Sequence, residues 1–283
     1  MKVPKISGRG IVASVVASVS FAAAAQATTL EITITNTAQI GGFAITPVYS
    51  AFHDGNFDAF DAGSAASAGV ELIAETGSPG GLPAERLAVS PDSVATVVAA
   101  PGSGPPTIDP GETTTATIDV DGSINRYFTF LSMLVPSNDT FLGNDDPLAY
   151  SLFDDFGNFS GERVIDVTAS LLWDAGTEVN DPLGGPAFVA MQDAADGVAE
   201  NGVVHGVESF AAFAGVETPL GILDGNLIDF GNDLSQFSVA TITIREVSGV
   251  VPLPAAGLFG LSGLLGLGGL SVLRRRKKGS QSA

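Results

Sequence analysis

The pattern of apolar and polar residues predicts a set of short β-strands. In the stretch T-L-E-I-T-I-T-N, Leu30, Ile32 and Ile34 alternate with polar residues, and a period of two is typical of a strand with one buried face. Residues 237–247 repeat this alternation in F-S-V-A-T-I-T-I-R-E-V. Three further apolar segments, each bounded by Gly, Pro, Asn or Asp, are also expected to be strands: 113–120, 127–135 and 163–173.

Many short strands joined by Gly- and Pro-rich connections predict an all-β fold, an antiparallel β-sandwich. Helix is expected only in residues 65–75 and 186–200, as one or two short helices in loops. No repeat of solenoid length is visible and no internal linker divides the chain. We therefore expect one domain over residues 28–247, followed by a short stalk at residues 248–254.

The first 27 residues predict a secretory signal peptide. Lys2, Lys5 and Arg9 precede an apolar run, and the small residues A-Q-A close the segment at Ala27. A basic start, an apolar middle and small residues at a cleavage point are the pattern of an exported protein. The alternative is a structural N-terminal helix, which is disfavoured because no polar face interrupts the apolar residues.

The C-terminal residues predict a transmembrane helix. Residues 255–273 carry no charge, and about 20 apolar residues suffice to cross a bilayer. The last ten residues, 274–283, begin with five consecutive cations, which are expected to hold this end on the cytoplasmic side. The alternative of a buried core helix is disfavoured by the many glycines and by this basic block, which consists of Arg274, Arg275, Arg276, Lys277 and Lys278.

The residues at the start of this span read V-P-L-P-A and are followed by the Gly- and Leu-rich segment and the basic block. This combination resembles the VPLPA/PEP-CTERM type of sorting tail of Gram-negative bacteria. The resemblance implies that an exosortase-type membrane protease is a transient partner and removes the helix. It also implies a destination at the cell surface or in the extracellular matrix, with the chain anchored in the inner membrane before processing. The implied sorting motif consists of Val251, Pro252, Leu253, Pro254 and Ala255.

Between these two ends the chain is strongly acidic. Eight of the twelve cationic residues lie in the ends, whereas all 31 acidic residues lie between them, so the exported part has a formal charge of 4 − 31 = −27. This charge excludes electrostatically driven binding of nucleic acid, because phosphate contacts need Lys and Arg. It fits solubility in salt, the binding of divalent cations, or both.

The chain has no cysteine and only two histidines, His53 and His205. Thiol catalysis, zinc–thiolate sites and iron–sulfur clusters are therefore excluded, and a multi-histidine metal centre is not expected. His53 and Asp54, with Ser132 or Ser137 as the nucleophile, would be the elements of a hydrolase. However, the chain has no G-x-S-x-G motif and no local spacing that supplies a catalytic triad.

Three segments place small polar clusters between apolar runs. They are A-F-H-D-G-N-F-D-A-F-D-A-G-S-A-A-S at 51–67, L-S-M-L-V-P-S-N-D-T-F-L-G at 131–143 and W-D-A-G-T-E-V-N-D at 173–181. These segments and their order, together with the I-T-I-R strand that ends at Arg245, resemble the spondin N-terminal domain family, which has bacterial members. The resemblance implies a C2-like β-sandwich that binds calcium in loops at one edge and acts in extracellular matrix or cell adhesion without catalysis. The chain lacks the cysteines of animal members and has Thr140 where they usually carry Trp.

Carried over to this sequence, the resemblance suggests Asp139 and Asp174 as calcium ligands, with Glu178 or nearby carbonyl groups completing the shell. The residue types are compatible, because calcium prefers six to eight hard oxygen ligands. Each aspartate follows an expected strand, so both carboxylates face one cavity if the strand ends lie side by side. Asn180 and Asp181 are weaker candidates. The alternative is that the two aspartates only cap turns through backbone amides.

These features together predict an exported calcium-binding β-sandwich of the cell surface or matrix. Its expected role is adhesion or biofilm-matrix assembly, with extracellular polysaccharide or surface glycans as partners and no enzymatic activity. One alternative is a calcium-dependent hydrolase of matrix polymers that uses the pair Asp154 and Asp155. Adjacent carboxylates on a strand point to opposite faces, so this pair requires a loop. A second alternative is a purely structural matrix protein without a specific ligand.

Overall fold

The structure is a computed structural model that describes residues 27–101, 106–207 and 209–247. The expected signal peptide (except Ala27), the sorting motif, the transmembrane span and the basic block all lie outside the described residues. Within the described ranges, no helix has the length and apolar character needed to cross a membrane.

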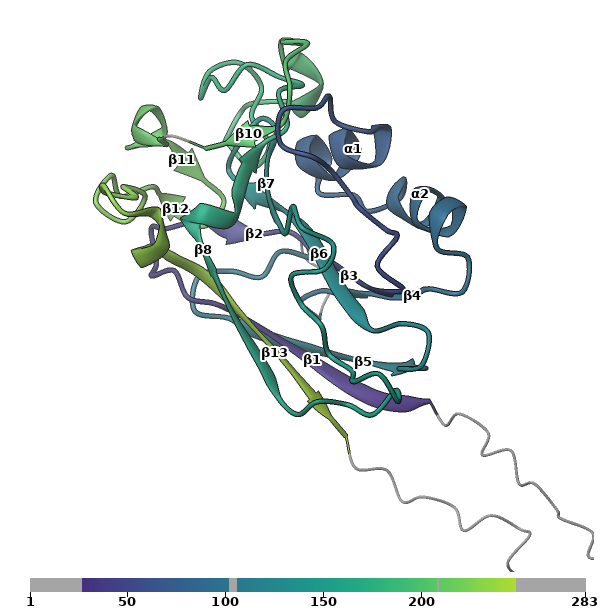
Figure 1. Cartoon of the computed structure of the whole chain (residues 1–283). Coiled ribbons are helices and arrows are strands. Elements are labelled where there is room, and N and C mark those ends of the chain that lie inside the picture. The colour runs from purple at the N-terminus through teal and green to yellow at the C-terminus, as the bar shows by residue number, and fades with distance from the viewer. Residues whose placement is uncertain (1–26, 102–105, 208, 248–283) are drawn as a thin grey trace, which may run out of the picture.

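Two antiparallel sheets form a sandwich (Figure 1), and the all-β fold predicted by the sequence is confirmed. The smaller sheet has four strands. They run in the order β5 (Thr113–Val120), β1 (Thr28–Asn36), β13 (Ser238–Glu246) and β8 (Arg163–Thr168). The first and last strands of the described chain are therefore neighbours in the middle of this sheet, with Ile32 opposite Ile244.

The larger sheet has seven strands, of which six follow one another across the sheet and β2 pairs separately with β6. A small two-stranded sheet lies apart from it. The order across the larger sheet is β10 (His205–Gly206), β9 (Leu172–Asp174), β7 (Thr140–Gly143), β6 (Tyr127–Val135), β3 (Val48–His53) and β4 (Val94–Val98), with β2 at Ala44–Ile45. The two-stranded sheet consists of β11 (Glu217–Thr218) and β12 (Gly221–Ile222).

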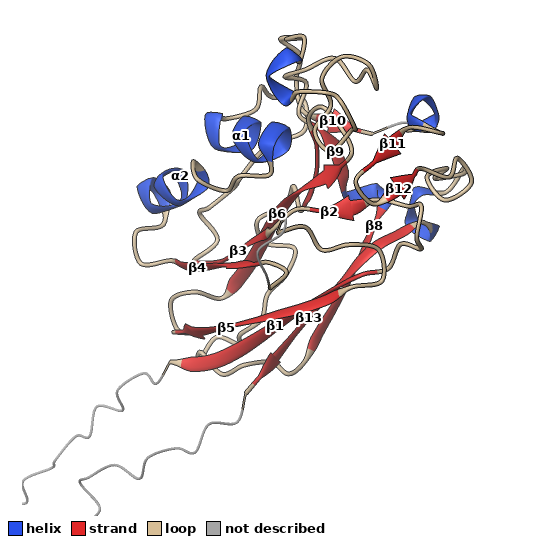
Figure 2. Ribbon diagram, turned by 180° about the vertical axis from the view of Figure 1, so that it is seen from behind, coloured by secondary structure: helices blue, strands red, loops and turns tan. Residues whose placement is uncertain are grey.

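Two α-helices cover the face of the larger sheet that points away from the smaller sheet (Figure 2). Helix α1 (Ala68–Thr76) begins after Ser67, whose hydroxyl accepts a hydrogen bond from the Val70 N–H, and ends at Gly77 with a left-handed φ of 70°. Both are standard helix caps. Helix α2 spans Leu82–Val89. The short 3₁₀ helices are η1 (Ala169–Leu171), η2 (Ala194–Asp196), η3 (Ala211–Phe213) and η4 (Leu234–Gln236).

Strand β6 is buried on both faces because it lies between the two apolar cores of the molecule. On one side, Phe128 and Phe130 pack in the core between the two sheets, which includes Ile32 of β1. On the other side, Leu131 packs in a second cluster that includes Ile73 of α1. A strand buried on both faces has no need for polar residues. This explains why residues 127–135 form an almost continuous apolar run.

Three expectations about secondary structure need correction or addition. The single strand predicted over residues 163–173 is wrong, because the chain turns at η1 and continues as β9 in the other sheet, with the Ala169 N–H bonded to the Phe237 carbonyl. The helix predicted at residues 186–200 is also wrong except for η2. Backbone groups there bond to distant segments, as when the Ala187 N–H donates to the Ser137 carbonyl. The helix predicted at residues 65–75 is confirmed as α1, whereas α2, β3 and β4 have no counterpart among the expected elements.

Replacement of Phe141 by Ala should destabilise the fold strongly. Phe141 on β7 is fully buried and its ring packs edge-on against Phe60 at 4.9 Å between centroids. We expect a loss of about 3–5 kcal/mol in the free energy of unfolding, measured by urea denaturation. The matched control is Phe156→Ala, because Phe156 is 87% exposed and its truncation should change stability by only about 0.5 kcal/mol or less. Equal effects of the two variants would contradict this account of the core.

Candidate metal site

The pairing of two short strands brings the two predicted aspartates together. Strands β7 and β9 are antiparallel neighbours, and Thr140 on β7 lies opposite Asp174 on β9. Asp139 is the residue before Thr140, and its carbonyl accepts a hydrogen bond from the Ala175 N–H at 3.1 Å. The side-by-side strand ends expected from the sequence are therefore present, although the neighbour of β9 is the start of β7 and not the end of β6.

The carboxylate of Asp139 is fully buried, with an exposed fraction of 0%. Its Oδ2 accepts three hydrogen bonds from the following loop: from the Thr177 N–H at 2.8 Å, the Thr177 hydroxyl at 3.2 Å and the Glu178 N–H at 3.0 Å. Its Oδ1 has no hydrogen-bond partner among the described residues, and neither has the equally buried hydroxyl of Thr140. A buried carboxylate oxygen without a partner is costly, so this atom needs a ligand or a proton.

The charges around Asp139 favour such a ligand. Burial, and after it the neighbouring negative charge of Asp174, raise the pKa of Asp139 to about 6, although the hydrogen bonds from Glu178 and Thr177 oppose the shift. Burial also raises the pKa of Asp174, against the hydrogen bond that it accepts from the Gly176 N–H at 2.8 Å. The pKa values of both neighbouring carboxylates are raised because the site disfavours negative charge. A bound cation would favour the ionised form of both carboxylates.

Both carboxylate oxygens of Asp174 accept hydrogen bonds, whereas only one oxygen of Asp139 does so within the described part of the chain. Its Oδ1 accepts from Gly176, whose φ of +67° is a left-handed conformation suited to glycine. Its Oδ2 accepts a short hydrogen bond from the Asn180 side-chain amide. The imidazole of His205 on β10 also lies close, with Nδ1 3.8 Å from Oδ1 of Asp174. The His205 ring is half exposed and Nδ1 also lies 3.0 Å from the Val203 carbonyl.

Glu178 lies beside Asp139, and its carboxylate is close enough to Asn138 and Asp139 for both to affect its pKa. Its backbone N–H bonds Asp139, but its side chain packs against Gly197, where an added Cβ would overlap the carboxylate. Burial raises the pKa of Glu178 to about 7, and the charge of Glu75 is the next largest cause. Glu178 therefore shares its surroundings with helix α1 more than with Asp174.

Glu75 is a residue that the sequence analysis missed. It lies in the last turn of α1, is half-buried, and has a pKa raised by burial and lowered by a hydrogen bond with Thr177. The Thr177 hydroxyl also lies 3.2 Å from Oδ2 of Asp139, so Thr177 stands between the helix and the aspartate, and its one proton is donated to either carboxylate but not to both. The sequence contains no signal for this neighbour, because residues 75 and 177 meet only through the packing of α1 on the larger sheet.

The two weaker candidates hold the surrounding loop in place. Asn180 donates its side-chain amide to Asp174. Asp181 donates its backbone N–H to the side-chain oxygen of Asn138 at 3.1 Å, and the Asn138 amide donates to the Gly184 carbonyl at 3.0 Å. The loop from residue 175 to residue 184 is therefore fixed by Asn138 and Asp139 together.

The arrangement fits calcium only in part. Across residues 27–101, 106–207 and 209–247, no group of three or more His, Cys, Asp or Glu side chains could hold a metal ion as it stands. A cation here would rely on the two aspartates and on neutral oxygens such as the Thr140 hydroxyl, backbone carbonyls and water. Calcium accepts such mixed oxygen ligands, whereas zinc prefers nitrogen and sulfur.

The residues of the catalytic alternatives have other partners. His53 is buried; it lies 3.0 Å from the Thr129 hydroxyl and accepts from the Gly55 N–H at 3.1 Å, so it stabilises its own loop. Ser132 and Ser137 donate their hydroxyls to backbone carbonyls of Thr46 and Leu134. Trp173 packs beside the site with its indole N–H donated to the Gly143 carbonyl, as expected for a core residue.

Asp154 and Asp155 lie in a loop and not on a strand. Asp154 accepts from the Phe156 and Asn158 N–H groups, both at 2.9 Å, and Asp155 forms an ion pair with Arg126 at 2.8 Å. Each carboxylate therefore already has a structural partner.

Fold and site define a class of protein: an all-β sandwich with a buried carboxylate pair where two strands meet their loops. The chain belongs to the spondin N-terminal domain family, because the model of that family, Spondin_N, matches residues 41–192, more than half of the 283 residues. Membership in this family indicates an extracellular or matrix protein. The matched range contains Asp139, Asp174 and Glu178. Among curated proteins, no relative matches the chain.

Replacement of Asp139 by Asn should stabilise the calcium-free protein above pH 6. The folded state holds the pKa of Asp139 at about 6, above its ordinary value of 3.8. Ionisation of the wild type therefore costs stability as pH rises through this window. Asn keeps an acceptor for Thr177 and Glu178 and has no charge to bury. In chelator, the variant should gain up to about 3 kcal/mol over the wild type by pH 8 and nothing near pH 4, measured by urea denaturation.

The control for this measurement is the exposed Asp92→Asn, for which the difference from wild type should be the same at both pH values. A pH-independent difference for Asp139→Asn would show that its carboxylate is not the destabilising group.

Proposed function

We propose that the domain binds one calcium ion through Asp139 and Asp174 and acts as a calcium-stabilised adhesion or matrix module outside the cell. The observation that carries the proposal is the fully buried Oδ1 of Asp139, which has no partner among the described residues and lies beside a second carboxylate. Calcium supplies the positive charge that neither Lys nor Arg provides at this position. We expect no catalysis, in keeping with the structural partners of Asp154 and Asp155.

The direct ligands would be Oδ1 of Asp139 and the carboxylate of Asp174, with the Thr140 hydroxyl as a neutral oxygen donor. Glu178 and Glu75 would add negative charge close by. Asp139 would also couple the ion to the loop, because its other oxygen accepts from Thr177 and Glu178. Binding of calcium would therefore stabilise the loop from residue 175 to residue 184.

Export and surface attachment form the second part of the proposal. The signal peptide sends the chain across the inner membrane of a Gram-negative bacterium, and residues 255–273 with the basic block anchor it there. An exosortase-type protease then recognises the V-P-L-P-A motif and releases the domain to the cell surface or matrix. The support is the sequence of the two ends and the extracellular character of the family.

The acidic surface supports a role in the matrix. With a formal charge of −27 between the two ends, the domain would be attracted to cations and, through bridging cations, to polysaccharide. We propose extracellular polysaccharide or surface glycans as the partner class. The second candidate function, a purely structural matrix protein, differs only in having no specific glycan.

Calcium binding should depend on both aspartates. Isothermal titration calorimetry should show that Asp139→Ala and Asp174→Ala each lower calcium affinity by about tenfold or more, which corresponds to roughly 1.4 kcal/mol or more. Glu75→Gln should cause a smaller loss, because Glu75 contributes charge and no direct ligand. The exposed Asp92→Ala is the matched control and should bind as the wild type does. Unchanged binding in both aspartate variants would refute the site.

Glycan binding should require calcium if the loops beside the site contact the partner. On an array of bacterial polysaccharides, the wild type should bind in calcium and lose binding in chelator, and Asp139→Ala should bind weakly under both conditions. Glycan binding that is unchanged by chelator would show that adhesion does not depend on the metal site. Cleavage of any arrayed glycan would support the hydrolase alternative instead.

A further inference from the structure

Both ends of the described chain leave the sandwich together. Strands β1 and β13 are antiparallel, with Leu30 opposite Glu246, and the Val247 N–H donates to the Thr29 carbonyl at 2.9 Å. The two tails consequently start side by side at one end of the molecule (Figure 1). The candidate metal site lies toward the other end, because Thr168, which leads through η1 to β9, pairs with Ser238 at the start of β13.

Two contacting loops form the surface at the end from which the tails leave. One is the β5–β6 turn, which follows Val120, the partner of Thr28. The other is the loop of residues 153–159, which comes shortly before β8. The first residue of β8, Arg163, pairs with Ile244 near the end of β13. The loops touch where an added Cβ on Gly157 would come within 2.8 Å of the Ser123 nitrogen. We call these two loops, residues 121–126 and 153–159, the proximal loops.

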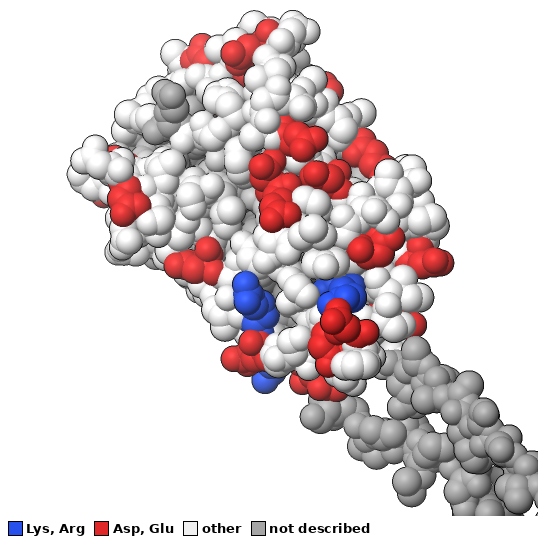
Figure 3. Space-filling model, viewed as in Figure 1, with Lys and Arg blue, Asp and Glu red and all other residues white. Residues whose placement is uncertain are grey.

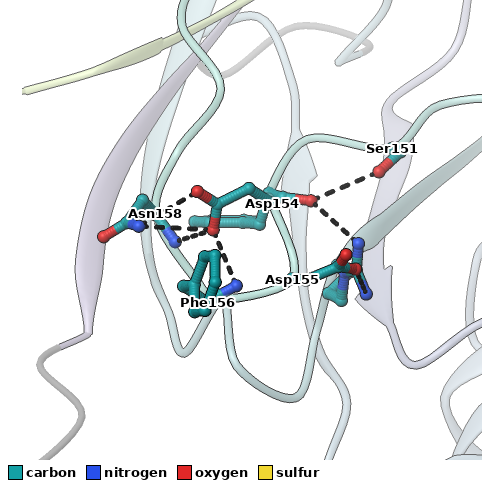
Figure 4. Close-up of polar contacts among 7 residues, drawn as sticks. Ser151, Asp154, Asp155, Phe156 and Asn158 are labelled. Atoms are coloured by element: carbon teal, nitrogen blue, oxygen red, sulfur yellow. Dashed lines mark hydrogen bonds and ion pairs between the residues drawn. The ribbon is translucent and has the colours of Figure 1, made fainter.

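The proximal loops each expose one large apolar side chain. Phe156 is 87% exposed and Ile124 is 42% exposed. Phe156 is held out by a rigid turn, because the Asp154 carboxylate accepts from the N–H groups of Phe156 and Asn158 (Figure 4). Below it, the rings of Phe153 and Phe159 pack edge-on with centroids 5.7 Å apart. Phe156 is 87% exposed and contributes little to this packing.

The charge distribution also distinguishes this end. The exported part has four arginines, of which Arg86 lies on α2 and is buried, with an exposed fraction of 6%. The other three lie toward the end at which the described chain begins and ends: Arg245 pairs with Glu31, Arg163 pairs with Ile244, and Arg126 precedes β6. The blue atoms visible in Figure 3 all lie in this half of the molecule. Arg126 and Arg245 neutralise Asp155 and Glu31 in ion pairs of 2.8 and 2.6 Å. Acidic residues elsewhere on the surface lack such partners among the described residues.

The chain between Val247 and the expected transmembrane helix is short, and its length limits how far the proximal loops can lie from the membrane. Eight residues lead from Val247 to Ala255, where the expected transmembrane helix begins, and they can extend over at most about 25–30 Å. This reach is close to the length of the nine-residue strand β13, about 30 Å. While the tail is in the bilayer, the proximal loops therefore stay near the lipid surface at a high effective concentration.

We infer that the proximal loops are a membrane-contact surface, and that Phe156 inserts into the interface of the bilayer that carries the C-terminal helix. Aromatic side chains are suited to this interface. A single aromatic side chain binds lipid weakly, but the short connection makes the contact intramolecular. Acidic side chains also lie at this end, among them Asp155 beside Phe156, so anionic lipid is expected to weaken the contact and neutral lipid to permit it. The surface contact directs the candidate metal site away from the membrane, and it rests on the anchoring in the proposed function.

Tryptophan fluorescence tests this contact, because the chain has only one tryptophan, Trp173, on β9 beside the candidate metal site. The full chain after signal-peptide removal is reconstituted in phosphatidylcholine vesicles with ordinary or brominated acyl chains. Phe156→Trp should lose fluorescence in the brominated vesicles, and the wild type should not. The matched control is Leu183→Trp, because Leu183 is 80% exposed in the loop held by Asn138, and it should behave as the wild type does.

A second labelling position keeps the test independent of the tryptophan substitution. The chain has no cysteine, so Phe156→Cys with an environment-sensitive fluorophore should show a blue shift in vesicles, and Leu183→Cys should not. Absence of both the quenching and the blue shift at residue 156 would overturn the membrane contact.

Flotation of the same vesicles after an alkaline wash shows whether the chain is anchored in the membrane. It therefore distinguishes a missing contact at residue 156 from a missing membrane anchor. A chain that floats without a signal at residue 156 is anchored and makes no contact through the proximal loops, which overturns this inference alone. A chain that does not float refutes the anchoring, and the membrane contact is refuted with it.

Discussion

Burial of β6 on both faces is the constraint on which the rest of the structure depends. One face of the strand supports the packing of the smaller sheet, and the other supports α1. Because β6 is fixed from both sides, the chain that leaves it through Ser137 and Asp139 has little freedom. The same packing brings the last turn of α1 next to the loop after β9, so the core and the candidate metal site share one scaffold.

The electrostatics of the site follow from a surface that is almost without cations. In most proteins a buried aspartate is paired with Arg or Lys, but residues 28–254 contain only four arginines and no lysine. Three of these arginines lie toward the end of the sandwich at which the described chain begins and ends, and Arg126 is separated from Asp139 by the length of β6. Burial, together with neighbouring carboxylates and without Arg or Lys among the described residues to offset it, therefore raises the pKa values of Asp139 and Glu178 to about 6 and 7.

Local sequence could predict the elements that depend on local pattern. Strands β1 and β13 alternate apolar and polar residues over their whole length, and α1 has a clear capping residue in Ser67. The run of residues 163–173 looked like one strand because its apolar content is continuous, yet the chain changes sheets at η1. The segment 186–200 does not form the predicted helix because its backbone N–H groups bond to distant segments. Ala187 donates to Ser137, which follows β6, and Ala190 donates to Glu217 on β11. Such long-range competition is invisible to a window of sequence.

The sequence by itself determined the charge, the absence of thiol chemistry, the all-β class and the two aspartates worth examining. These depend on composition and on short-range periodicity, which folding does not alter. Only the tertiary structure decided that Asp139 keeps one oxygen without a partner, that Glu75 approaches from a helix a hundred residues away, and that Glu178 turns toward Gly197. The reason is physical: burial, charge proximity and hydrogen-bond saturation are properties of neighbours in space, and the pairing of β7 with β9 chooses those neighbours.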